Sequence, residues 1–251
     1  MFTYYRGKVA YDGTDYKGWQ LQRKGIPTVQ GMVETAFSGI FDTERIKVQG
    51  ASRTDSGVHA RGQVFHFRAH KDIPPLNVLR GANTSLPRDI RILELDYSDK
   101  SFHPIFSACG KHYSYTFIYP DDPLRNRYAY RLPSLVDFLR MEEALPLFTG
   151  EKDFSAFRNM ASRDPEKSPV CIIRSFSLEK NPGVYTFHIK GNRFLYNMIR
   201  IIMGTLLYLG LGKLREEDII RAFETGDRHS IGKTLAPDGL VLEEVYYRDD
   251  Y

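Results

Sequence analysis

The chain has 251 residues, of which 42% are hydrophobic and 26% charged, and its formal net charge is +4. This length can bury a core as one large domain or two small ones, while so small a net charge neither excludes nor demonstrates a polyanionic partner. The two cysteines, Cys109 and Cys171, have no second Cys at metal-ligand spacing, which argues against a zinc site or a disulfide scaffold.

The N-terminus lacks the apolar core of a signal peptide. The stretch 194–212 is nearly all apolar, but it carries Arg200 near its middle. An arginine at that depth is expensive for a lone membrane-spanning helix. We therefore expect a buried helix of a soluble protein and a cytoplasmic location.

The first half of the chain predicts a regular order of strands and helices. Residues 28–41 place apolar side chains at helical spacing and begin with Thr28, a suitable N-cap. The other expected elements are strands over 8–11, 45–49, 63–68 and 89–96 and a short helix over 75–82. This β-α-β-β-α-β order is the ferredoxin-like pattern. RNA-binding modules of this topology stack bases on the open sheet face, although topology alone does not decide function.

From about residue 106 the order recurs more loosely. The expected elements are a strand over 111–119, a helix over 135–148, paired strands over 170–178 and 184–190, a buried helix over 195–211, a polar helix over 215–225 and a last strand over 239–247. We predict an α+β fold of two ferredoxin-like (RNP-like) halves, residues 1–105 and 106–251. They would join into one long, mostly antiparallel sheet with helices on one face and a central RNA-binding cleft.

The stretch Gly50–Gly62 is the richest in polar and charged side chains. It lies between two predicted strands and places Arg53 and Arg61 around Asp55, which is followed by the turn signal Ser56-Gly57. Asp55 is either a turn aspartate that bonds its own backbone or a carboxylate kept ionised by guanidinium groups for nucleophilic attack. The residues alone leave both interpretations open.

Arg200 is the only formally charged residue between Leu195 and Leu211. A guanidinium in an apolar helix needs an anionic partner or a dense set of acceptors. A structural ion pair with any acid and a functional contact with Asp55 both satisfy that need.

One predicted strand carries an aromatic stripe: Tyr113, Tyr115, Phe117 and Tyr119 share a face. Such a stripe is usually core or sheet surface, but a member at a binding surface can stack on a base, contributing roughly 1–3 kcal/mol. The sequence has neither a Walker loop nor a G-x-G-x-x-G fingerprint. We therefore expect a redox-neutral reaction without ATP, NAD or metal.

The loop also resembles a known signature. Ala51-Ser-Arg-Thr-Asp-Ser-Gly-Val-His-Ala60 is similar to the GRTDxGVHA motif of the tRNA pseudouridine synthase A family. Further stretches that look like the family's motifs follow in order along nearly the whole chain: 11–22, 29–30, 81–87, 106–108, 111–115, 153–158, 191–200, 204 and 236–240. Ser52 and Ser56 stand where the family often has Gly and Ala, and His103-Pro-Ile105 stands where an arginine is common.

The resemblance implies a specific activity and site. Members isomerise uridine to pseudouridine in the tRNA anticodon stem-loop, typically at tRNA positions 38–40, usually as homodimers without a cofactor. Carried onto this sequence, Asp55 is the nucleophile, Tyr113 stacks on the target uracil, Arg200 pairs with Asp55, and Arg53 contacts the flipped nucleotide or its phosphate. The main alternative is a non-catalytic RNA-binding module. A phosphodiesterase is a weaker alternative because metal ligands are lacking.

Overall fold

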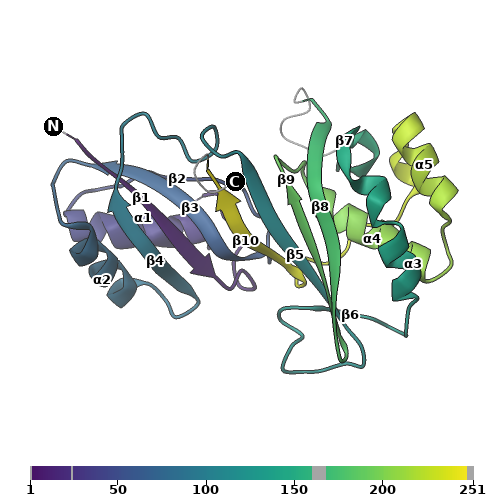
Figure 1. The fold of residues 1–251 in the computed structure, drawn as a ribbon. Helices are drawn as coiled ribbons and strands as arrows, with labels where there is room; N and C mark the ends of the chain where they lie inside the picture. Colours follow the sequence, from purple (N-terminus) through teal and green to yellow (C-terminus); the bar gives the residue numbers. More distant parts are fainter. Residues whose placement is uncertain (1, 24, 160–167, 248–251) are drawn as a thin grey trace. The chain divides into compact units, whose positions relative to one another are not determined.

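The computed structural model describes residues 2–23, 25–159 and 168–247, which form two compact units (Figure 1). Unit 1 comprises residues 1–109 and 241–251, and unit 2 comprises residues 110–240. The sequence-based boundary at 105/106 lies close to the point where the chain leaves unit 1. The last strand, which the sequence placed in the second half, belongs largely to unit 1. Its pairing joins segments far apart in the chain, so no local pattern reveals it.

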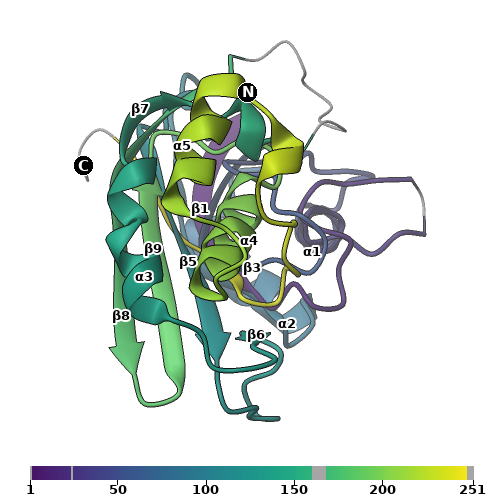
Figure 2. The ribbon, with the colours of Figure 1, turned by 90° about the vertical axis from the view of Figure 1, so that its right-hand side faces the viewer.

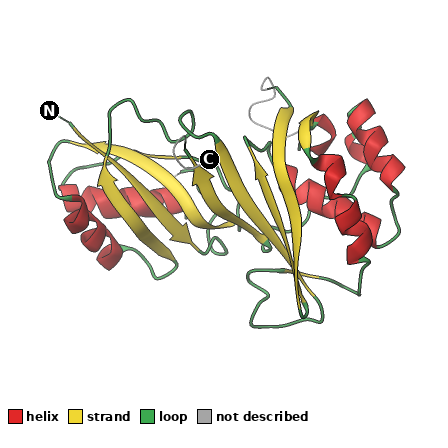
Figure 3. Cartoon of the chain, viewed as in Figure 1, coloured by secondary structure: helices red, strands yellow, loops and turns green. Residues whose placement is uncertain are grey.

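Unit 1 has the predicted β-α-β-β-α-β order (Figure 1), and Figure 3 distinguishes its helices from its strands by colour. Its elements are β1 (Thr3–Tyr11), α1 (Val29–Phe41), β2 (Val48–Gly50), β3 (His59–Ala69), α2 (Pro75–Ser85) and β4 (Ile90–Tyr97). β1 pairs antiparallel with both β3 and β4, and β2 pairs antiparallel with β3. The late strand β10 (Leu240–Tyr246) then pairs in parallel with the first residues of β3.

One face of the unit 1 sheet packs against the helices. Alternate residues of β1, Tyr5 and Val9, are fully buried, and the ring of Tyr5 stacks on Phe67 of β3 with centroids 4.9 Å apart. Phe37 of α1 stacks on the same Phe67 at 4.5 Å. Thr28 caps α1 by accepting a hydrogen bond from the backbone N–H of Gly31, as predicted. The two-residue period of the strand and the helical period of α1 therefore meet in one aromatic core.

Unit 2 is also built from antiparallel strands and helices. Its strands are β5 (Gly110–Ile118), β6 (Tyr130–Arg131), β7 (Gly150–Asp153), β8 (Val170–Asn181) and β9 (Val184–Gly191). Its helices are α3 (Phe138–Glu143), α4 (Met198–Gly210) and α5 (Glu216–Thr225), with 3₁₀ turns η1 (Leu145–Phe148), η2 (Ser155–Phe157) and η3 (Arg228–Ser230). The order β5-β9-β8-β7 is antiparallel throughout. The helices α3, α4 and α5 lie on one side of β8 and β9, the side that Figure 2 faces. The α+β class with mostly antiparallel strands is confirmed.

Two helix predictions differ from the structure for local reasons. The helix expected over 135–148 is split into α3 and η1, because Pro146 has no backbone N–H to continue an α-helix. The helix expected over 195–211 begins only at Met198, because Asn197 takes a left-handed conformation with φ of 61°. Among the described residues, no helix is long and apolar enough to cross a membrane.

Candidate active site

The Asp55 loop, residues 51–58, connects β2 to β3 in unit 1. Its side chains alternate in burial: Ser52 and Thr54 are only 8% and 7% exposed, whereas Arg53 is exposed and Asp55 is partly exposed. The inward side chains therefore hold the loop, and the outward ones are presented to whatever binds there. This places two of the predicted site residues, Arg53 and Asp55, on the same loop.

Gln63 of β3 holds the start of the loop. Its side-chain amide donates to the carbonyl oxygen of Ser52 at 2.6 Å and accepts from the backbone N–H of Ser52 at 3.1 Å. The neighbouring Ala51 donates its N–H to Val64 O at 2.8 Å. Gln63 is completely buried, so its amide extends the backbone ladder between β2 and β3 by one further pair of hydrogen bonds.

The segment 11–20 holds the rest of the loop. Trp19 donates its N–H to the carbonyl of Thr54 at 3.2 Å, and Gly57 donates its N–H to the carbonyl of Tyr16 at 3.2 Å. The N–H of Val58 closes a turn onto Asp55 O at 3.2 Å, with Gly57 at φ of 81°. The turn predicted at Ser56-Gly57 is thus present, and its hydrogen bond fixes the position of the Asp55 carbonyl.

This segment approaches the loop so closely that side chains are excluded. Gly18 has φ of 87°, and a Cβ built on it would lie 2.6 Å from Thr54 O. A Cβ on Gly50 would lie 2.4 Å from the indole of Trp19. Glycine is required at both positions: at Gly18 the loop backbone occupies the space of a side chain, and at Gly50 the only tryptophan of the chain occupies it.

Two side-chain contacts fasten the segment 11–20 to other parts of unit 1: one joins Tyr16 to Asp89, just before β4, and the other joins His59, the first residue of β3, to Asp12 and Gly13. The phenol of Tyr16 donates to Asp89 Oδ1 at 2.8 Å, and burial, followed by this bond to a carboxylate, raises the pKa of Tyr16. The tyrosine therefore remains a protonated donor. At the other end of the loop, His59 Nδ1 lies 3.0 Å from the N–H of Gly13 and 3.1 Å from Asp12 Oδ1.

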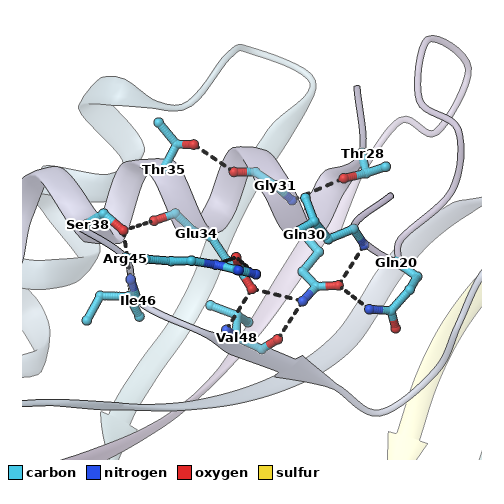
Figure 4. Close-up of polar contacts among 11 residues, drawn as sticks. Gln20, Thr28, Gln30, Gly31, Glu34, Thr35, Ser38, Arg45, Ile46 and Val48 are labelled. Atoms are coloured by element: carbon cyan, nitrogen blue, oxygen red, sulfur yellow. Dashed lines mark hydrogen bonds and ion pairs between the residues drawn. The ribbon is translucent and has the colours of Figure 1, made fainter. Parts of the chain in front are cut away.

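A buried polar network joins α1 to β2, just before the Asp55 loop (Figure 4). Gln30 donates to Glu34 Oε1 and to Val48 O, both at 2.9 Å, and its own Oε1 accepts from Gln20 at 2.8 Å. Glu34 also accepts from the N–H of Val48 at 3.0 Å and pairs with Arg45 at 2.9 Å. Gln30 and Glu34 are 7% and 5% exposed, so the strand that enters the loop is fixed by hydrogen bonds in a dry environment.

Replacing Gln30 with leucine should lower the free energy of unfolding by about 1–3 kcal/mol, because buried groups such as Val48 O lose their partner. Equilibrium unfolding in urea measures this. Thr35→Val is the control on the same helix: its exposed hydroxyl bonds only within α1, to Gly31 O, and the change should cost less than about 0.5 kcal/mol. Equal losses in the two variants would contradict a stabilising role for the network.

The other two predicted site residues lie in unit 2. Tyr113 of β5 is 6% exposed, and its ring meets Phe194 edge-on with centroids 5.3 Å apart. Tyr115 and Phe117, from the same stripe, are fully buried. The phenol of Tyr115 donates to Ala236 O at 2.8 Å, and burial raises its pKa well above the ordinary value. Most of the stripe is therefore core, and Tyr113 lies at its end nearest Phe194.

Arg200, on the first turn of α4, is partly buried rather than enclosed. Its Nε donates to Leu235 O at 2.7 Å, and Nη1 donates to Asn197 Oδ1 at 2.8 Å. The chain near Leu235 can approach α4 because residue 204 is glycine: a Cβ there would lie 1.8 Å from Lys233 O. Two acceptors within unit 2 thus hold the guanidinium in a fixed direction. Its predicted pairing with Asp55 joins residues of different units and stays a prediction.

The comparisons with known proteins agree with these motifs. The family model described as tRNA pseudouridine synthase matches residues 8–107 and 144–248. The chain belongs to the tRNA pseudouridine synthase family. It is 42% identical to the tRNA pseudouridine synthase A of Acetivibrio thermocellus over 242 residues, which is 95% of this chain and 97% of the relative. The corresponding protein of Citrifermentans bemidjiense is 41% identical over 96% of both chains. That of Clostridium kluyveri is 39% identical over 95% of this chain and 97% of its own.

Family membership confirms the predicted class of enzyme, an isomerase that makes pseudouridine. Among the described residues, no group of three or more His, Cys, Asp or Glu side chains could hold a metal ion. Sequence reasoning found the residues that the loop presents but missed those that hold it, notably Tyr11, Thr54 and Gln63. The alternation of small polar residues with Arg53 and Asp55 was the signal that could have indicated inward anchors at Ser52 and Thr54.

Proposed function

We propose that this enzyme isomerises uridine to pseudouridine in the anticodon stem-loop of tRNA, at tRNA positions 38–40, with Asp55 as its nucleophile. The observation that carries the proposal is how Asp55 is presented: Ser52 and Thr54 of the same loop are buried and clamped, while Asp55 itself stays partly exposed. The names of the relatives support tRNA as the substrate.

The chemistry needs a carboxylate and a protected site. The bond between C1′ and N1 of the uridine breaks, the base turns, and a bond forms between C1′ and C5. The hydrogen on C5 leaves as a proton and N1 gains one, so the reaction has no net redox change. Three routes use the same carboxylate: ionised Asp55 attacks C6 of the uracil, attacks C1′ of the ribose, or assists the formation of a glycal.

The target base must leave the stack before it can react, at a cost of a few kcal/mol. Arg53 is exposed next to Asp55 on the same loop, and we propose that its guanidinium contacts the flipped nucleotide or its phosphate. We propose that Tyr113, which is 6% exposed and meets Phe194 edge-on, replaces the lost stacking when the uracil enters the site. We further propose, on the basis of the family resemblance, that the enzyme is located in the cytoplasm and forms a homodimer.

Arg200 is proposed as the partner that keeps Asp55 ionised and aimed. Arg200→Met should lower kcat by roughly 10²–10³-fold, the size of effect expected when one preorganised donor is lost from a site. Arg200→Lys keeps the charge but not the planar fork that reaches both Leu235 O and Asn197, and it should recover only part of the rate. Arg221→Met, on the exposed part of α5, is the matched control. If Arg200→Met turned over at the rate of the control, Arg200 would have no role in catalysis.

The activity test uses unmodified tRNA transcripts labelled with tritium at uridine C5. The enzyme should release the label, and release should fall to background when the uridines at tRNA positions 38–40 are replaced with cytidine. A non-catalytic RNA-binding module would bind the transcript without releasing label. Undiminished release from the substituted transcript would contradict the proposed target positions while leaving the synthase activity standing.

A further inference from the structure

A buried side chain, that of Thr54, stands directly before Asp55 in the loop. Thr54 points into unit 1 and is 7% exposed, while its neighbours Arg53 and Asp55 face outward to different degrees. Successive side chains of an extended segment point to opposite sides. A group that fixes the inward side chain at position 54 therefore also fixes the direction in which position 55 leaves the backbone.

The hydroxyl of Thr54 shares a hydrogen bond of 2.8 Å with the phenol oxygen of Tyr11. Both side chains are buried, with Tyr11 only 4% exposed. In a dry environment such a bond is electrostatically stronger than in water. The carbonyl of Thr54 is held independently by the backbone N–H of Trp19 at 3.2 Å. The Trp19 bond fixes the position of the loop backbone, and the hydroxyl bond in addition limits its rotation at Thr54.

Tyr11 is itself rigidly placed. It ends β1, where its Cα is paired with Ala60 of β3 on one side and with Ile90 of β4 on the other. Its ring packs against Trp19 with centroids 6.0 Å apart. A phenol held by two strands and an indole can fix the position of a loop side chain, whereas a mobile surface residue could not.

We propose that Tyr11 is a positioning residue of the isomerisation: through its bond to Thr54, its hydroxyl sets the direction of the Asp55 carboxylate. This inference rests on the proposed role of Asp55 as nucleophile. Because both hydroxyls are buried, they act on the reacting geometry and not on the affinity for tRNA. A displacement of the order of 1 Å at a reacting group can cost about 10²-fold in rate.

The test compares Tyr11→Phe, Thr54→Val, the double variant and Thr54→Ser. Tritium release is measured in single turnover with saturating enzyme, together with the Kd for the tRNA transcript and the Tm. Each of the first two changes should lower the rate by about 10–100-fold and leave the Kd within about twofold. The double variant should be no slower than the slower single variant, because both remove the same bond. Thr54→Ser should keep most of the rate.

Tyr5→Phe is the matched control. Tyr5 lies on the same strand and the same sheet face, and its hydroxyl bonds to the backbone of Ile73, away from the loop. It should lower the Tm without lowering the single-turnover rate. Rate losses that multiply in the double variant, or a Tyr11→Phe rate equal to that of Tyr5→Phe, would overturn the positioning role. If instead Asp55→Asn retained activity, the proposed nucleophile would fail, an outcome distinct from the failure of Tyr11.

Discussion

Asp55→Asn is expected to lower single-turnover tritium release by about 10⁴–10⁶-fold, the range found when a member of a catalytic set that forms a covalent intermediate is removed from an enzyme. Asparagine keeps the size and shape of the side chain, but its amide cannot attack carbon as a carboxylate does, and its NH2 group donates hydrogen bonds where the carboxylate accepts them. The loop around position 55 is held by neighbours, including the bonds of Gln63 to Ser52 and of Trp19 to Thr54. The variant should therefore fold and bind tRNA as the unchanged enzyme does.

The matched control is Asp96→Asn, which removes the same charge from an exposed position of β4. Its release rate should stay within about twofold of the unchanged enzyme, in line with a surface substitution away from special features. Binding of the tRNA transcript is measured for both variants. If Asp55→Asn released tritium at the same rate as Asp96→Asn, Asp55 would be a turn residue and another group would perform the attack.

The sequence predicted the elements of unit 1 well because its signals are local. The helical spacing of apolar residues after Thr28 and the alternation along β3 follow from helix and strand geometry, and both elements are present. Asp55 was recognised through the motif around it. The motif alone left the turn interpretation open, and the structure contains a turn there: the Val58 N–H closes it onto Asp55 O, while the Asp55 side chain stays partly exposed. The role of Asp55 as nucleophile stays a prediction.

The groups that hold the Asp55 loop could not be predicted in the same way, because they join distant parts of the chain. Tyr11 and Thr54 are 43 positions apart, and neither has a neighbour pattern that names the other. The parallel pairing of β10 with the start of β3 is longer in range still. Arg200 was expected to need acceptors, but the sequence could not predict that one of them is Leu235 O. This contact depends on the close approach of the chain near Leu235 to Gly204 of α4. Such contacts follow from tertiary packing and not from periodicity.

Gly18→Ala is expected to lower the rate of pseudouridine formation by about 10²-fold or more, a large effect for one added methyl group. Gly18 combines φ of 87° with a Cβ position 2.6 Å from Thr54 O and 3.1 Å from the carbonyl carbon of Asp55. Both neighbours are backbone atoms, so they cannot swing aside as a flexible side chain does. The loop has to shift as a whole, and the carboxylate of Asp55 shifts with it.

The chain offers a control for the backbone strain alone. Gly25 has φ of 90°, close to that of Gly18, but a Cβ there meets nothing within 4 Å. Gly25→Ala should carry the same conformational cost, about 1–2 kcal/mol for a left-handed residue, without moving the Asp55 loop. Urea unfolding should therefore show a loss in both variants, whereas single-turnover tritium release should fall only in Gly18→Ala. Equal rates in the two variants would mean that the Asp55 loop tolerates displacement, and the close approach of residue 18 to the loop would then have no part in catalysis.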